Sequence, residues 1–175
     1  MHKLFTWLFL AISFSAFADS GKSAAQYNAE ILDSFCIQNQ DNFGNIVFMA
    51  KSAGGKVLPD QQADPAMREL GGKTVFVPYE GKNYMVAFAN GGGCTVITKN
   101  IDHVNLAKLL KHHFQVVLVD RQASLSQINE LYKVKLKGIY KGAVISLVYA
   151  QSETGYTEGS ISFLPASIVK RTLEQ

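Results

Sequence analysis

The chain has 175 residues, and its 17 lysines and arginines against 14 acidic residues give a formal net charge of +3 at pH 7. A charge this small does not indicate nucleic-acid binding, and we expect no nucleic-acid partner. We also predict no cofactor, because no nucleotide- or metal-binding motif occurs with its required spacing.

The first 18 residues contain the three parts of a secretory signal peptide in the required order. A positive start at residues 2–3 precedes an almost wholly apolar run over residues 4–14, and residues 16–18 read Ala-Phe-Ala. Signal peptidase requires small residues at its two recognition positions, so we predict cleavage between Ala18 and Asp19. The apolar run is shorter than the roughly 20 residues that cross a bilayer, which disfavours a membrane anchor. We therefore predict secretion to the periplasm.

Cleavage after Ala18 leaves residues 19–175, which we expect to form a single α+β domain. A length of 157 residues is typical of one domain with its own hydrophobic core. The removed segment contains one lysine and no acidic residue, so the net charge of the remaining domain is +2. No segment after the signal is apolar enough to predict a transmembrane helix.

The chain has two cysteines, Cys36 and Cys94. Cysteines of an exported protein most often pair because the compartment is oxidising, and we predict a disulfide between these two. The alternative is a reactive thiol at Cys36. It is disfavoured because the chain has no Cys-x-x-Cys motif and because a paired sulfur is not a nucleophile.

Two helices are predicted at the start of the domain. Apolar residues recur at helical spacing over residues 24–38 and would direct Cys36 inward. Asp41 or Asn42 can cap a second helix, which Gly54 and Gly55 end. Residues 56–73 are rich in proline, glycine and aspartate and predict a loop with one helical turn near Met67. The two apolar stripes consist of Tyr27, Ile31, Leu32 and Phe35, and of Phe43, Ile46, Val47 and Ala50.

A three-stranded meander is predicted over residues 74–79, 84–89 and 94–98, with turns between the strands. Asp102 then caps a helix that extends through Leu110 and ends at a basic Lys-His-His tract. The apolar side of this helix includes Val104, Ala107 and Leu110.

Residues 114–119 predict a fully buried strand because they are almost continuously apolar. Residues 132–137, 143–150 and 160–164 predict further antiparallel strands separated by glycines. The regular alternation of strands and helices that marks a parallel sheet is missing. The predicted fold class is therefore α+β, a mainly antiparallel sheet with two N-terminal helices and one helix inserted between strands.

Lysines alternate with apolar residues over 132–137, so a strand there would bury Tyr132, Val134 and Leu136 and expose the lysines. One interpretation is a basic contact face for an acidic partner or an anionic surface. The other, which we favour, is a solvated strand face whose lysines prevent edge-to-edge pairing. The residues of this possible contact face are Lys133, Lys135, Lys137 and Lys141.

Several partial motifs lack the rest of the pattern that their chemistry requires. Residues 71–74 end like a phosphate-binding loop, but Met67 occupies the position of its first glycine. Ser167 and Lys170 have serine–lysine spacing without the companion motifs of penicillin-binding enzymes. We name no catalytic and no metal-binding residue, since spacing does not single out any of His103, His112, His113, Glu69, Glu80, Glu153 or Glu158.

The Phe35-Cys36 pair, together with Gly93-Cys94-Thr95-Val96, resembles small exported or lipid-anchored proteins of Gram-negative bacteria that have no assigned function. The resemblance implies an envelope location and paired cysteines, with no activity to transfer. The chain differs from the lipid-anchored members because it has no cysteine directly after the cleavage site.

These observations lead us to expect a non-enzymatic periplasmic protein that binds a protein partner in the envelope, as inhibitors, immunity proteins and assembly factors do. One alternative is an envelope hydrolase whose site assembles only in three dimensions. The other is a structural factor that contacts anionic envelope surfaces through the lysine-rich strand.

Overall fold

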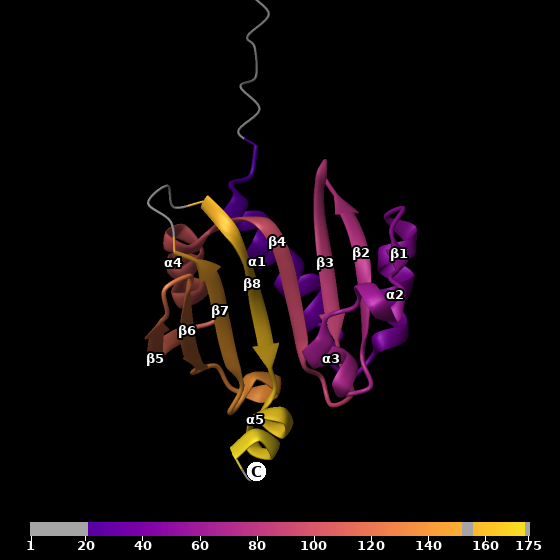
Figure 1. Ribbon diagram of the computed structural model, residues 1–175. Helices are drawn as coiled ribbons and strands as arrows, with labels where there is room; N and C mark the ends of the chain where they lie inside the picture. Colours follow the sequence, from indigo (N-terminus) through magenta and orange to yellow (C-terminus); the bar gives the residue numbers. More distant parts are fainter. Residues whose placement is uncertain (1–20, 152–155, 174–175) are drawn as a thin grey trace, which may run out of the picture.

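Eight strands form one antiparallel sheet in the computed structural model, which describes residues 21–151 and 156–173. The strand order is β1-β2-β3-β4-β8-β7-β6-β5, so two four-stranded meanders join along β4 and β8 (Figure 1). The strands are β1 Lys56–Val57, β2 Lys73–Tyr79, β3 Lys82–Phe88, β4 Cys94–Asp102, β5 Val116–Ala123, β6 Gln127–Val134, β7 Val144–Ala150 and β8 Tyr156–Leu164.

Helices cover one face of the sheet and leave most of the other face open (Figure 1). Helix α1 continues into one π-helical segment, η1, and packs with α4 and α2 against the covered face. The short helices α3 and α5 lie at the end of the sheet where β3 ends and β4 begins. The bounds are α1 Ala24–Ile31, η1 Leu32–Ile37, α2 Phe43–Ser52, η2 Asp60–Gln62, α3 Pro65–Glu69, α4 His103–His113, η3 Gly138–Tyr140 and α5 Ala166–Leu173.

Side-chain caps fix where the main helices begin. The Ser23 hydroxyl accepts from the Gln26 backbone N–H while the Gln26 side chain accepts from the Ser23 N–H, a complete capping box for α1. Asn42, one of the two predicted caps, accepts from the backbone of Asn45 at the start of α2. Asp102 caps α4 as predicted.

The core lies between the helices and the covered face of the sheet. Alternate residues of the central strands, including Val86, Val96, Ile145 and Ile161, are fully buried against α1, η1 and α4.

A disulfide joins Cys36 of η1 to Cys94 of β4 across 58 positions, which confirms the predicted pairing. On the chain-entropy model this cross-link stabilises the fold by roughly 4 kcal/mol.

The predicted α+β class with a mainly antiparallel sheet is confirmed, but the predicted helix arrangement is incomplete. The described residues contain five α-helices, of which α3 is the helical turn predicted near Met67 and α5 was not predicted. On α4 the buried residues are Leu106 and Leu110, whereas Val104 is 50% exposed. The prediction that Val104 lies on the apolar side of this helix is therefore wrong.

The prediction of a fully buried strand at residues 114–119 is also wrong. Strand β5 forms an edge of the sheet, and Val117, Leu118 and Val119 are 47%, 40% and 54% exposed. A continuous apolar run is typical of a buried strand, but the run itself carries no information about which strands will lie on either side.

The lysine-rich strand ends earlier than predicted. Strand β6 ends at Val134, so Lys133 lies on it, while Lys135 and Lys137 follow it. The Lys135 N–H still donates to the carbonyl of Gln115, the residue before β5. Gln115 has a positive φ of 49°, which is not extended backbone, and the ladder ends at the Val116–Val134 pair. The predicted alternation of burial is found in part, since the three lysines are exposed and Tyr132 and Val134 are buried, but Leu136 is only half-buried.

Candidate binding groove

Strands β3 and β4 are paired along only part of their length. Their ladder runs from the Phe88–Cys94 pair to the Met85–Ile97 pair and stops there. Beyond it the two strands separate, which Figure 1 shows as an opening between them at the top of the sheet. The remaining part of β4 pairs only with β8, through a bulge between Thr98 and Ile101.

Local sequence explains both sides of this opening. A two-residue turn links β2 to β3, with positive φ values of 45° at Glu80 and 74° at Gly81. This turn extends β3 back to Lys82, past the end of its ladder with β4. On the other side, a side chain at Gly159 of β8 would place Cβ 2.4 Å from the Val148 carbonyl oxygen of β7, so the close pairing of β8 with β7 needs glycine at this position.

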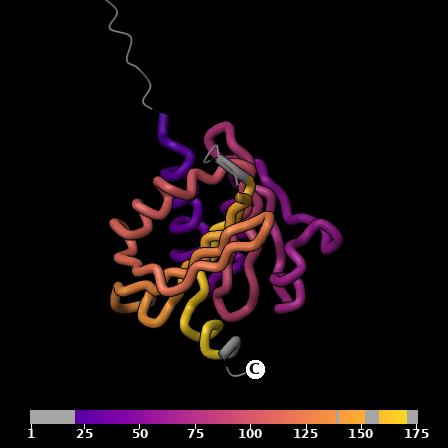
Figure 2. The backbone as a smooth tube through the Cα atoms, turned by 60° about the vertical axis from the view of Figure 1, so that its left-hand side comes forward, coloured from indigo at the N-terminus to yellow at the C-terminus, as the bar shows by residue number. Residues whose placement is uncertain are grey.

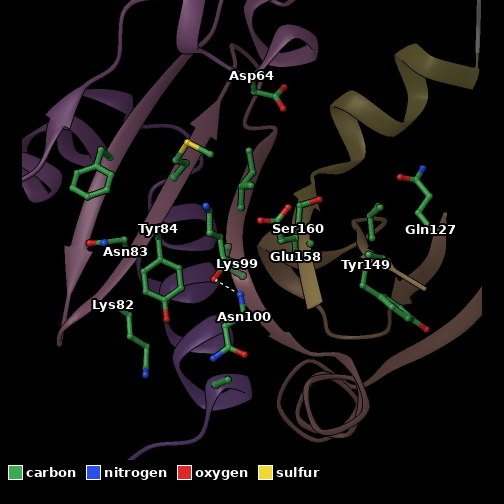
Figure 3. A pocket seen from close by; sticks show the side chains of 18 of the residues that line it. Asp64, Lys82, Asn83, Tyr84, Lys99, Asn100, Gln127, Tyr149, Glu158 and Ser160 are labelled. Atoms are coloured by element: carbon green, nitrogen blue, oxygen red, sulfur yellow. Dashed lines mark hydrogen bonds between the residues drawn. The ribbon is translucent and has the colours of Figure 1, made fainter. Parts of the chain in front are cut away.

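A groove with a volume of about 1000 Å³ lies over this opening and the neighbouring open face of the sheet, and we call it the open-face groove. Figure 3 shows polar residues of β3 on one side, those of β4 in the middle, and those of β7 and β8 on the other side. Its apolar residues include Phe76, Met85, Ile97 and Val148, and its polar residues include Asp64, Lys82, Asn83, Lys99, Asn100, Gln127, Glu158 and Ser160.

Four apolar side chains of the groove and Ser160 form one row across the sheet. Residues opposite each other in a ladder share a face, and the register continues from each strand to its neighbour. The row is therefore set by successive pairs, from Phe76 through Met85, Ile97 and Ser160 to Val148. This row crosses β2, β3, β4, β8 and β7 on the open face.

Two lysines stand on opposite sides of the opening between β3 and β4 (Figure 3). Neither Lys82 nor Lys99 forms an ion pair with any residue that the structure describes. The Lys82 ammonium lies 4.9 Å from the centre of the Tyr27 ring, a cation–π contact that leaves its charge uncompensated. Nearby Lys22, in contrast, is neutralised by Glu30 at 2.7 Å and Glu80 at 3.5 Å.

Tyrosines stabilise the base of the groove next to α1. Burial raises the pKa of Tyr84 to about 12, so this side chain is neutral at physiological pH. The Tyr79 hydroxyl donates to Glu30 at 2.9 Å. The hydrogen bond from Lys22, and then that from Tyr79, lower the pKa of Glu30, which therefore stays ionised.

A second polar cluster surrounds Glu130 on β6. Its carboxylate accepts hydrogen bonds from Tyr132 at 2.5 Å, from Tyr149 at 3.2 Å and from Arg121 at 3.2 Å. The ring of His103 stacks on Tyr149 with centroids 4.1 Å apart. Because all the donors converge on one carboxylate, the cluster holds β5, β6 and β7 together. It contains no histidine–carboxylate pair of the kind that general acid–base catalysis uses.

The residues considered above for catalysis do not come together in the structure. Both cysteines are in the disulfide. The described residues contain no group of three side chains able to hold a metal ion. Residues 71–74 lead into a strand rather than a helix, unlike a phosphate-binding loop. The Ser167 hydroxyl on α5 donates to the Gly91 carbonyl, while Glu153 lies outside the described residues.

The other predicted site residues lie apart from the groove. All four lysines of the possible contact face are exposed, and none of them lines the groove. The predicted cleavage site at Ala18 and Asp19 lies outside the described residues.

Sequence reasoning missed the groove. The available signal was that strands 74–79 and 84–89 carry apolar residues at both odd and even positions, which leaves apolar side chains on the open face.

Within the described part of the chain, no helix combines the length and apolar character needed to cross a membrane. Comparison with protein-family models, curated proteins and solved structures gave no match to this chain.

Proposed function

We propose that this is an exported, non-enzymatic protein that binds a protein partner, and that the open-face groove holds an extended acidic segment of that partner. The observation that carries the proposal is the groove itself, a row of apolar side chains beside two lysines without ion-pair partners. The disulfide between Cys36 and Cys94 is compatible with an oxidising compartment, which supports export together with the predicted signal peptide.

The dimensions of the groove favour a polypeptide segment. The row from Phe76 to Val148 spans four strand-to-strand steps, or about 19 Å at the usual spacing. An extended chain covers that length with about six residues. The volume of about 1000 Å³ is at the upper end of the range for small-molecule sites.

The groove is lined by two lysines, Lys82 and Lys99, and by two carboxylates, Asp64 and Glu158, and it is the lysines that flank the opening. Lys82 and Lys99 lie on the two sides of the opening, so carboxylates entering between them would interact with both. Such charges at the rim of an interface mainly steer association and set specificity. We therefore expect partner binding to weaken at high ionic strength.

The composition of the groove favours binding over hydrolysis. The residues that line it include no histidine and no cysteine. Its two carboxylates, Asp64 and Glu158, come from different elements and lie apart in Figure 3. A hydrolase would need a nucleophile or water-activating base with a partner group, which these residues do not provide.

Affinity capture with matched variants tests this proposal. The exported form of the chain, K82E/K99E and the control K51E/K73E would each be used to capture protein from periplasmic extract at 50 and 500 mM salt. Lys51 and Lys73 are exposed and lie outside the groove, so the control makes the same charge change elsewhere. We expect one partner whose recovery falls at least tenfold for K82E/K99E alone. Equal recovery by all three proteins would contradict the proposal.

A further inference from the structure

Two basic tracts that are separate in the sequence meet at one corner of the molecule. Helix α4 ends at an exposed Lys-His-His tract, and the Lys135 N–H donates at 3.2 Å to the carbonyl of Gln115, two residues after that helix. The rings of Phe114 and Tyr140 lie 6.3 Å apart and connect the same segments. Figure 2 shows the end of α4 next to the loop that follows β6, at the lower left. We call Lys111, His112, His113, Lys133, Lys135, Lys137 and Lys141 the basic corner; all seven are exposed.

Acidic side chains are few near the basic corner. Residues 103–119 and 131–151 contain no aspartate or glutamate. Between these segments lie Asp120 and Glu130, of which Glu130 is engaged by Arg121. Asp33 of η1 lines a pocket with His113 and Tyr140. None of the seven residues forms an ion pair with a described residue. A chain with a net charge of +3 therefore concentrates five lysines at one corner.

Exposed aliphatic side chains adjoin the basic corner. Val117, Leu118 and Val119 lie on the edge strand β5, each at least 40% exposed. Val117 is directly opposite Lys133 in the β5–β6 ladder, so an aliphatic and a cationic side chain share one face of the sheet there. Apolar side chains next to lysines are the combination that peripheral proteins use at a lipid headgroup layer.

We propose that the basic corner, together with residues 117–119, is a docking surface for a membrane rich in anionic phospholipid. The lysines bind the phosphate groups, and the exposed valines of β5 insert among the headgroups. The exposed aliphatic side chains favour a lipid surface over a purely anionic polymer, which offers charge but no apolar layer. This surface is separate from the open-face groove, so the protein can bind a membrane and a protein partner simultaneously.

Co-sedimentation with vesicles tests the lysines. The exported form of the chain would be mixed with vesicles of phosphatidylcholine alone or with about one third phosphatidylglycerol, at 50 and 500 mM salt. We expect binding to the anionic vesicles at low salt, weakened at least tenfold in K133Q/K135Q/K137Q/K141Q. The control K51Q/K56Q/K73Q/K170Q removes the same charge from exposed lysines elsewhere and should bind like the wild type. Far-UV circular dichroism verifies that each variant is folded.

A second pair of variants tests the aliphatic residues. V117S/V119S should bind anionic vesicles several-fold more weakly than the wild type at unchanged charge. The control L70S/V104S changes exposed aliphatic residues away from the corner and should bind normally. The variant K82E/K99E should also bind vesicles normally, which separates this proposal from that for the groove. The proposal would be overturned if the protein did not bind anionic vesicles, or if the lysine variant and its control bound them equally. Salt-sensitive capture of an acidic protein without vesicle binding would also overturn it.

Discussion

Cys94 of β4 lies directly opposite Phe163 of β8 in the ladder that joins the two meanders, and its sulfur is bonded to Cys36. The disulfide thus attaches η1 to the pair of strands, β4 and β8, that joins the two halves of the sheet. Phe163 is fully buried, so this pair forms part of the hydrophobic core as well as the sheet.

Removing the disulfide should therefore destabilise the whole domain. We expect C36A/C94A to lower the free energy of unfolding by roughly 4 kcal/mol, because the unfolded chain is no longer closed across 58 positions. Urea unfolding of the oxidised wild type and the variant measures the difference. A loss below about 1 kcal/mol would mean that native strain in the bond offsets the entropic gain.

Glu130 should stabilise the β5–β6–β7 part of the sheet. Replacing it with alanine leaves the hydroxyls of Tyr132 and Tyr149 without their acceptor, and buried polar groups that lose a partner cost about 1–3 kcal/mol. Urea unfolding should show this loss for E130A and little change for the control E158A, since Glu158 is exposed. Equal stability of the two variants would contradict a structural role for the Glu130 cluster.

The stability of the fold should decrease at alkaline pH. Burial raises the pKa of Tyr84 to about 12 from its ordinary value of 10.0, so folding favours the neutral phenol. A pKa that is raised in the folded state gives a stabilisation that is complete below pH 10 and is lost as the pH rises from 10 towards 12. Unfolding free energies measured between pH 8 and 11.5 should fall more steeply for the wild type than for Y84F. Parallel curves for the two proteins would show that Tyr84 is not responsible.

Local signals in the sequence predicted the local structure well. Asn42 and Asp102 cap helices as predicted, because a cap depends on residues within one helical turn. The first meander was predicted because its turn residues occur between apolar runs of strand length. The cysteine pairing followed from the compartment inferred from the signal peptide.

Non-local features could not be predicted in the same way. The pairing of Cys94 with Phe163 joins strands 69 positions apart, and no turn or spacing signal records it. The apolar run at Val117–Val119 was wrongly assigned to a buried strand. A strand's position within a sheet depends on which strands pair on either side of it, and the run does not show this. Strand burial is thus a property of the sheet topology rather than of the run itself.

The groove depends on the register of β3 with β4 and on the point where these strands separate. Met85 and Ile97 become neighbours on the open face only through the register of β3 with β4. Lys82 and Lys99 stand apart because those strands separate beyond this pair. Neither the register nor the separation is encoded in a short motif, so single-residue reasoning assigned these lysines no role.

Site-specific photo-crosslinking tests the groove most directly. A benzoylphenylalanine at Met85 lies in the apolar row, whereas the same group at Val104 lies on an exposed part of α4. Illumination of cells that export each variant should give one protein adduct from position 85 and none from position 104. The adduct should disappear when K82E/K99E is combined with the probe at 85, and persist with K51E/K73E. No adduct at position 85, or the same adduct from both positions, would contradict partner binding in the groove.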